Sequence, residues 1–251
     1  MDLSGQNILV TGASKGIGFA IAKYLLEQGA RVGVHYHTGK IDADALVAQF
    51  GPDNAFSIQA NLENSSEVIS LFEQAVHHLG KIDSLILNAG IFLPHAIDQS
   101  TKEWYRVWKQ TIAVNLDSVG LLTKLALDHF KSEGRGRIVY IGSRAAFRGE
   151  TEEYLGYAAS KGGLTSLARS VARSFGKYNI KAFVVAPGFT RTAMAEQFIG
   201  EYGEARVLKE LALNELTKVT DIAPLVGFIC TGLMDHATGT TIDINAGSYI
   251  H

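Results

Sequence analysis

The sequence has little of several features that would assign it to a specialised class. Only one of its 251 residues, Cys230, is a cysteine, so the chain has no internal disulfide and does not depend on an oxidising compartment. A single cysteine among scattered histidines argues against a structural zinc site. Apolar runs stay short of the roughly 18 residues of a membrane span, and the first seven residues lack the features of a signal peptide. We therefore expect a cytoplasmic protein with no metal and no membrane contact.

The chain also lacks an excess of charge of either sign. It has 23 Lys and Arg against 25 Asp and Glu, a net charge of −2, whereas a dedicated nucleic-acid binder would show a basic excess. Its length and 47% hydrophobic content suit one domain spanning residues 1–251. Glycine, in contrast, is abundant, with 26 residues that gather at the ends of predicted strands.

Short apolar runs alternate with longer segments whose apolar residues repeat at helical spacing. The expected strands are 7–11, 31–35, 55–60, 84–88, 137–142, 181–186 and 241–245. The expected helices are 16–28, 42–50, 65–79, 101–132, 157–176, 201–214 and 221–232. This alternation predicts an α/β fold whose parallel sheet is covered by helices on both faces. Residues 188–214 interrupt the rhythm and are either a substrate lid or an ordinary surface excursion.

A glycine-rich turn joins the first strand to the first helix. Gly12 permits the tight turn, Gly16 lets the backbone approach a pyrophosphate, and Gly18 lets helix and strand pack closely. No acidic residue follows the second strand before Asp42, while Lys15 places a positive charge in the turn. This combination favours NADP(H), with NAD(H) possible. A turn without a ligand and a merely solvated Lys15 are the alternatives.

Four further residues have the chemistry that carbonyl–alcohol interconversion needs. Tyr157 and Lys161 share a helix face at the i, i+4 spacing. The ammonium is expected to lower the tyrosine pKa from ~10 by about 1–3 units, which suits a proton donor. Ser143 ends a strand, where its hydroxyl can hold a substrate oxygen or simply form a turn. Asn115 lies in an apolar helical stretch, so it must satisfy a buried partner or serve a site.

Together these motifs resemble the short-chain dehydrogenase/reductase family over residues 7–245. The resemblance implies a Rossmann-type, doubly wound parallel sheet of seven strands, a nicotinamide cofactor and a homotetramer. In that family's pattern Tyr157 is the general acid in reduction, Lys161 lowers its pKa and binds the nicotinamide ribose, and Ser143 holds the substrate carbonyl. Asn115 positions a water that links Lys161 to solvent. The implied cofactor contacts are Gly12, Ser14, Lys15, Gly16, Ile17, Gly18, Tyr36, His37, Asn61, Leu62, Asn88, Ala89, Gly90, Tyr157, Lys161, Pro187, Gly188, Thr190 and Thr192.

The sequence departs from the family's pattern in several places. Asn61 stands where the family often has an aspartate near the adenine, although an amide still accepts a hydrogen bond. The separation between Ser143 and Tyr157 is 14 residues, one more than is usual, which predicts a local bulge within 144–155. Residues 245–247 read Asn-Ala-Gly where a glycine pair is common.

The branch that the sequence resembles most is the 3-oxoacyl-carrier-protein reductases, and many sugar and sugar-acid reductases share its motifs. Arg144 and Arg148 lie between Ser143 and Tyr157, so they either recognise an anionic substrate such as a keto acid or are solvated. His95 and Phe189 are the other candidate pocket residues. The leading hypothesis is an NADP(H)-dependent carbonyl reductase acting on a small molecule. The alternatives are a same-fold enzyme that works chiefly as an oxidant of alcohols and a cofactor-binding regulator that performs no chemistry.

Overall fold

Residues 1–192, 200 and 207–250 are described by the computed structural model of the chain. Its centre is a seven-stranded sheet in the order β3-β2-β1-β4-β5-β6-β7, parallel at every pairing, as the alternating pattern predicts. The strands are β1 (Asn7–Val10), β2 (Arg31–Tyr36), β3 (Ala55–Gln59), β4 (Ser84–Leu87), β5 (Gly136–Ile141), β6 (Ile180–Pro187) and β7 (Thr241–Ile244). The order reverses direction between β1 and β4, the place where open α/β sheets bind ligands.

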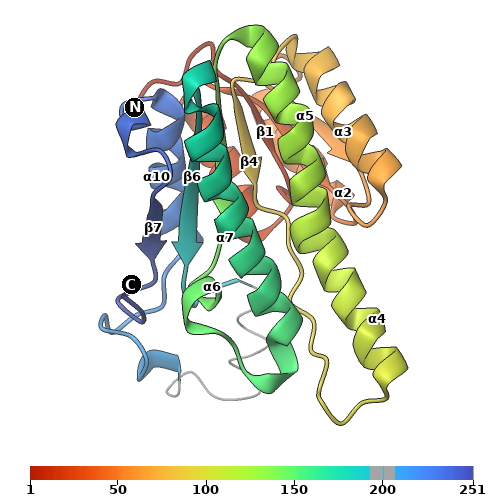
Figure 1. Cartoon of the computed structure of the whole chain (residues 1–251). Coiled ribbons are helices and arrows are strands. Elements are labelled where there is room, and N and C mark those ends of the chain that lie inside the picture. The colour runs from red at the N-terminus through yellow and green to blue at the C-terminus, as the bar shows by residue number, and fades with distance from the viewer. Residues whose placement is uncertain (193–199, 201–206, 251) are drawn as a thin grey trace.

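Helices cover both faces of this sheet (Figure 1). They are α1 (Gly16–Glu27), α2 (Lys40–Phe50), α3 (Ser65–Leu79), α4 (Thr101–Ile112), α5 (Ser118–Glu133), α6 (Ala145–Arg148), α7 (Leu155–Phe175) and α10 (Val219–Thr231). One core lies between the sheet and α3, α5 and α7, and the other between the sheet and α1, α2 and α10. Helix α1 packs directly on α10, so segments about 200 residues apart in sequence are neighbours.

The apolar runs in the strands follow from this double burial. Ile8 and Val10 enter one core and Leu9 enters the other, because successive side chains of a strand point to opposite faces. All four residues of β1 are buried. A strand buried on both faces therefore reads as an uninterrupted apolar run, whereas a half-solvated strand would alternate.

The structure corrects the expected boundaries in two places. The single helix predicted over 101–132 is divided, because the π-helical turn η1 (Ala113–Asp117) separates α4 from α5. The predicted bulge after Ser143 is a pair of short helices, α6 and the 3-10 turn η2 (Glu152–Tyr154). About half of the proposed lid, 193–199 and 201–206, and with it the first six residues of the helix predicted over 201–214, fall outside the described residues.

Two kinds of feature are absent from the described residues. Among them no helix combines the length and the hydropathy that crossing a bilayer requires. Nor do three or more His, Cys, Asp or Glu side chains within this part of the chain gather where a metal ion could be held. The single cysteine, Cys230, is a buried thiol on α10.

Candidate active site

The glycine turn between β1 and α1 has the geometry that its sequence predicts. Gly12 and Gly16 have φ angles of +64° and +57°, in the left-handed region that side chains disfavour. A Cβ on Gly18 would lie 2.2 Å from the Gly12 carbonyl oxygen, so the helix packs against the turn only because this residue lacks a side chain. A Cβ on Gly16 would lie 3.5 Å from Cγ2 of Thr192, which places the loop after β6 against the turn.

Asn88, the residue after β4, holds this turn in place. Its Nδ2 donates to the carbonyl oxygens of Thr11 at 2.9 Å and Gly12 at 3.1 Å. In return, the Thr11 hydroxyl oxygen accepts from the backbone N–H groups of Asn88 and Ala89 at 3.0 and 3.1 Å. Asn88 and Ala89, which are predicted to contact the cofactor, thus shape the surface on which a dinucleotide phosphate would lie.

His35 on β2 is a second residue that holds the glycine turn in place, and the sequence alone did not identify it. Its Nδ1 accepts from the Gly12 N–H at 2.9 Å, and its Nε2 lies 3.1 Å from the Ala60 carbonyl oxygen. These two contacts assign the neutral form with the proton on Nε2. Burial lowers the pKa of His35 to about 4, which keeps the ring neutral at physiological pH. The available signal was a polar ring within a strand that is otherwise apolar and buried.

The residues expected around the adenosine half of the cofactor differ in how far they are exposed to solvent. Lys15 and His37 are exposed beside the turn, and Asp42 is exposed in the first turn of α2. Tyr36, in contrast, is packed in the core beneath α1 and α2. Asn61 uses its Oδ1 to accept from the Glu63 N–H at 3.0 Å.

Ser143 and Tyr157 come together although 14 residues separate them. Ser143 lies two residues beyond the end of β5, Tyr157 lies in the first turn of α7, and the Ser143 side chain comes close enough to the Tyr157 hydroxyl to act on its pKa. The Ser143 hydroxyl oxygen also accepts from the Ala145 N–H at 3.1 Å. Phe92 packs edge-on against the Tyr157 ring, with ring centroids 4.8 Å apart. The two short helices absorb the additional residue without separating the pair.

The expected lowering of the Tyr157 pKa is wrong for this structure. Tyr157 as a whole is only partly buried, yet the exclusion of water around its hydroxyl raises the pKa to about 12, and the nearby Ser143 side chain opposes that rise only in part. Lys161 does not reverse the direction, because its Nζ donates to the Ile141 carbonyl at 2.8 Å and lies 5.8 Å from the Tyr157 ring centroid. Burial also lowers the pKa of Lys161, to about 8.

Asn115 lies in the π-helical turn, and its side chain joins two elements of the site. Its Oδ1 accepts from the Ile91 N–H at 2.8 Å, and its Nδ2 donates to the Ile91 carbonyl at 2.9 Å and the Ser160 hydroxyl at 3.2 Å. A Cβ on Gly90 would lie 3.4 Å from the Asn115 Oδ1 and 3.6 Å from the Lys161 Nζ. The buried polar residue in an apolar helix thus has buried partners and lies next to Lys161.

The loop after β6 closes the same end of the sheet. The Gly188 N–H donates to the Ile244 carbonyl at 3.0 Å, and the Thr190 hydroxyl donates to the Gly188 carbonyl at 3.2 Å. A Cβ on Gly188 would lie 2.7 Å from the Asn245 Cβ, so glycine is required for this approach. Pro187 accepts at its carbonyl from the Arg144 N–H at 3.2 Å, which links this loop to the residue after Ser143.

Besides Ser143 and Tyr157, the four other candidate substrate residues have different environments. Arg144 is 3% exposed and therefore not a solvated arginine, and its guanidinium lies 4.7 Å from the Phe189 ring centroid. Arg148 is less buried and shares with Arg144 an ion pair to Glu210. His95 is fully buried, and its Nε2 accepts from the Gly156 N–H at 3.1 Å at the start of α7. The structure thus places His95 inside the packing that positions α7 and not at a surface that a substrate reaches.

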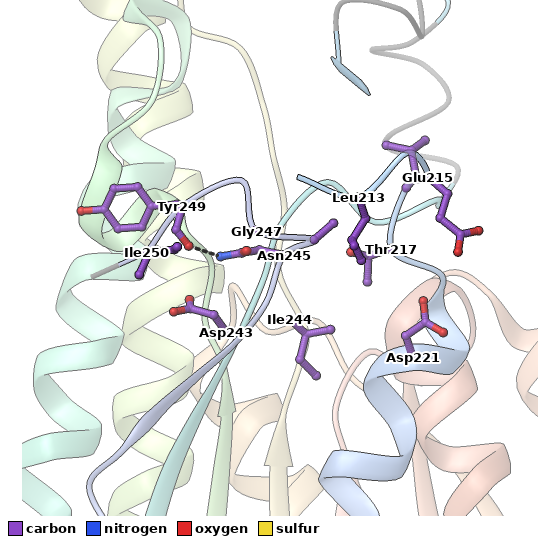
Figure 2. A pocket seen from close by; sticks show the side chains of 12 residues that line it. Leu213, Glu215, Thr217, Asp221, Asp243, Ile244, Asn245, Gly247, Tyr249 and Ile250 are labelled. Atoms are coloured by element: carbon purple, nitrogen blue, oxygen red, sulfur yellow. Dashed lines mark hydrogen bonds between the residues drawn. The ribbon is translucent and has the colours of Figure 1, made fainter. Parts of the chain in front are cut away.

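A cavity of about 510 Å³ lies beyond the carboxyl end of β7 (Figure 2). Its walls come from Leu213, from residues 215–217, 243–247 and 249–250, and from Asp221 on α10. Asn245 donates from Nδ2 to the Tyr249 carbonyl at 2.8 Å, the dashed line in Figure 2. Ala246 stands where the family commonly has a glycine. Its φ of +54° lies in the left-handed region, which glycine adopts without strain. None of Asn115, Ser143, Tyr157 and Lys161 lines this cavity.

Comparison with known proteins gives one consistent result. The family model for short chain dehydrogenase matches residues 6–202. The 3-oxoacyl-(acyl-carrier-protein) reductase FabG of Escherichia coli is 32% identical over 250 residues, covering 100% of both chains. A short chain dehydrogenase from Burkholderia cenocepacia in complex with NADP is 32% identical, with a TM-score of 0.89 and 99% of both chains covered. A 3-ketoacyl-(acyl-carrier-protein) reductase from Brucella melitensis complexed with NADH is 25% identical, with a TM-score of 0.89, covering 99% of this chain and 100% of that one.

The fold, the glycine turn and the Ser143–Tyr157–Lys161 cluster agree with these full-length similarities. The chain therefore belongs to the short-chain dehydrogenase family and is an oxidoreductase that binds a nicotinamide dinucleotide and acts on CH–OH groups.

Proposed function

We propose that this chain reduces a ketone to a secondary alcohol with NADPH, with Tyr157 as the proton donor. The observation that supports this proposal most directly is the approach of the Ser143 side chain to the Tyr157 hydroxyl, close enough to act on its pKa, with the Lys161 amine buried nearby. Both hydroxyls lie at the carboxyl edge of the sheet, the edge that also carries the glycine turn. A carbonyl oxygen that accepts from both hydroxyls would be polarised and ready to take a proton.

The dinucleotide fits the residues that would hold it. The left-handed Gly12 and Gly16 and the side-chain-free Gly18 leave backbone N–H groups at the start of α1 available to a pyrophosphate. When it is bound, the nicotinamide supplies the hydride in reduction and takes it up in oxidation. The protein's part is to orient the reacting groups, and Lys161 and Asn115 lie where they would position Tyr157 and connect it to further proton carriers.

The Tyr157 hydroxyl is in its protonated form at neutral pH. A pKa of about 12 means that it starts reduction in the form that donates a proton. In the oxidative direction the same group must act as a base, for which the phenolate is needed. The phenolate is also what remains after donation, so burial disfavours it in both directions, and the pKa is compatible with reduction without selecting it.

The proposed preference for NADPH rests on charge around the ribose. Lys15 is exposed in the glycine turn, and between His37 and Ile41 no carboxylate is present to repel a 2′-phosphate. Relatives bind either cofactor, since the Burkholderia structure contains NADP and the Brucella structure NADH. Titration of each reduced cofactor, with Lys15→Ala as the variant, measures the preference.

The first substrate class is the 3-oxoacyl thioester that the curated relatives reduce by name. A second class, ketones that carry an acidic group, is favoured by the buried Arg144 next to Ser143. The proposed setting is a single-domain protein of the cytoplasm that assembles as a homotetramer; light scattering on the purified chain tests the assembly.

The test is the decay of NADPH absorbance with 3-oxoacyl thioesters, simple ketones and keto acids. Tyr157→Phe is expected to lower kcat at least 10²-fold and to leave NADPH binding nearly unchanged, because it removes only the proton donor. Tyr178→Phe, on an exposed ring beyond α7, serves as the matched control. Full activity of Tyr157→Phe would refute the assigned role. NADPH binding without turnover of any carbonyl would favour the non-catalytic alternative.

A further inference from the structure

Arg144 is a buried cation immediately after the serine of the active site. Its side chain is 3% exposed, and its backbone N–H is fixed on the Pro187 carbonyl at 3.2 Å. One face of the guanidinium covers the Phe189 ring at 4.7 Å. Removing a charge from water in this way is costly unless a partner compensates it, so the position calls for an anion.

The anion present is the side chain of Glu210, and it compensates Arg144 incompletely. One carboxylate oxygen, Oε2, accepts from Arg144 Nη2 and from Arg148 Nη1, both at 3.0 Å. The Nη1 of Arg144 is buried and has no hydrogen-bond partner among the described residues. Two guanidinium groups therefore share one oxygen atom, whereas each could bind a carboxylate through two parallel hydrogen bonds.

Glu210 is also held only weakly at its position between Arg144 and Arg148. Its side chain is 43% exposed, and ion pairs that involve exposed carboxylates contribute little to stability. The other carboxylate nearby, Glu150, contacts Arg148 at 3.8 Å and is largely buried, and burial raises its pKa. Glu150 therefore does not supply the missing partner to Arg144 Nη1.

We propose that Arg144 and Arg148 bind a carboxylate group of the substrate, whose keto oxygen is held by Ser143, and that Glu210 occupies this carboxylate position when no substrate is bound. This inference rests on the proposed function and selects its second substrate class, the keto acids, over the 3-oxoacyl thioesters. The phenyl ring of Phe189 supports the flat guanidinium of Arg144 and orients its fork. A 3-oxoacyl thioester has no carboxylate to offer at this position.

The test compares kcat/KM with NADPH for acetoacetate and methyl acetoacetate, two ketones that differ by the charge and one methyl group. The wild-type chain is expected to favour the acid at least tenfold. Arg144→Met is expected to lower kcat/KM for the acid by about tenfold to hundredfold, the range for a lost charged hydrogen bond, and to leave the ester unaffected. Glu210→Gln is expected to raise kcat/KM for the acid, because it removes the competing carboxylate. Arg173→Met, on the exposed face of α7, is the control.

A binding measurement separates this inference from the proposed function. Calorimetric titration of the NADP⁺-loaded chain with acetoacetate is expected to show affinity that Arg144→Met removes and Glu210→Gln increases, whether or not the ketone is turned over. If turnover fails but this pattern appears, the proposed reaction is wrong and the carboxylate site stands. The inference is overturned if wild type treats acid and ester alike, if Arg144→Met impairs both equally, or if Glu210→Gln weakens acid binding.

Discussion

Replacing Lys161 with methionine is expected to stabilise the folded chain while abolishing turnover. The Lys161 amine is buried, and that burial lowers its pKa from 10.5 to about 8. A difference of this size corresponds to about 3 kcal/mol by which the folded state disfavours the charged amine. Methionine keeps the apolar stem and removes the charge, but it also removes the hydrogen bond to the Ile141 carbonyl, which is worth about 1.5–3 kcal/mol for a charged donor. The net expectation is a gain of up to about 1.5 kcal/mol at pH 7.

The pH dependence of this gain identifies its cause. Below pH 8 the lysine is protonated in both states, so the folded chain bears the whole cost of the buried charge. Between pH 8 and 10.5 only the unfolded chain keeps the proton, and the cost disappears as the pH rises through this window. Methionine does not titrate. The advantage of Lys161→Met over wild type is therefore expected to be largest at neutral pH and to shrink by about 2 kcal/mol at pH 9.5.

Urea unfolding at pH 7 and pH 9.5 measures both quantities in the same chain. Lys102→Met, at an exposed position of α4, controls for the loss of a lysine and is expected to give the same difference from wild type at both pH values. A Lys161→Met chain that is less stable than wild type at pH 7, or a gain that does not change with pH, would refute the reasoning. Loss of activity in the stabilised variant would show that the buried charge is retained for function.

Two other substitutions test the frame of the cofactor site. The free energy of unfolding of the wild type is expected to fall by about 3 kcal/mol as the pH drops from 6.5 to 4, because the folded state keeps His35 neutral while the unfolded chain takes up the proton. In urea unfolding, His35→Gln is expected to flatten this pH dependence. The same substitution is expected to weaken NADPH binding several-fold, because it removes the ring that accepts from the Gly12 N–H. Gly18→Ala is expected to abolish measurable NADPH binding and to cost several kcal/mol, since the added Cβ would meet the Gly12 carbonyl at 2.2 Å.

Each of these expectations has a contrary outcome. An unchanged pH slope in His35→Gln would mean that another group titrates in this window, and unchanged NADPH affinity would mean that the ring does not position the turn. Wild-type affinity and stability in Gly18→Ala would show that helix α1 can move away from the turn at little cost. Gly120→Ala, at a helical position with open space around its Cβ, is the matched control.

The order of strands and helices could be predicted because burial on both faces leaves a local signal in the sequence. The continuous apolar run of β1 and the helical spacing in α1 are properties of neighbouring residues. The glycine turn was equally accessible, since the left-handed φ angles of Gly12 and Gly16 restrict those positions to glycine.

The parts that could not be predicted depend on contacts between distant residues. His35 reaches Gly12 and Ala60 only because three neighbouring strands are in register, and Arg144 meets a carboxylate 66 residues away. The i, i+4 spacing shows that Tyr157 and Lys161 share a face, but it contains no information on burial or on where the amine points. Burial, therefore, decided the direction of the Tyr157 pKa against the pairwise expectation.

The packing of α1 on α10 has a consequence for how the chain acquires its structure during synthesis. Tyr24 of the first helix lies against Gly227, where an added Cβ would come within 2.7 Å of its ring. Until residue 231 has left the ribosome, α1 and α2 cover only part of that side of the nascent sheet, and the apolar side chains that α10 would cover are exposed. A nascent chain stalled before this point is therefore expected to need a chaperone, although the other layer, built from α3, α5 and α7, can already be in place.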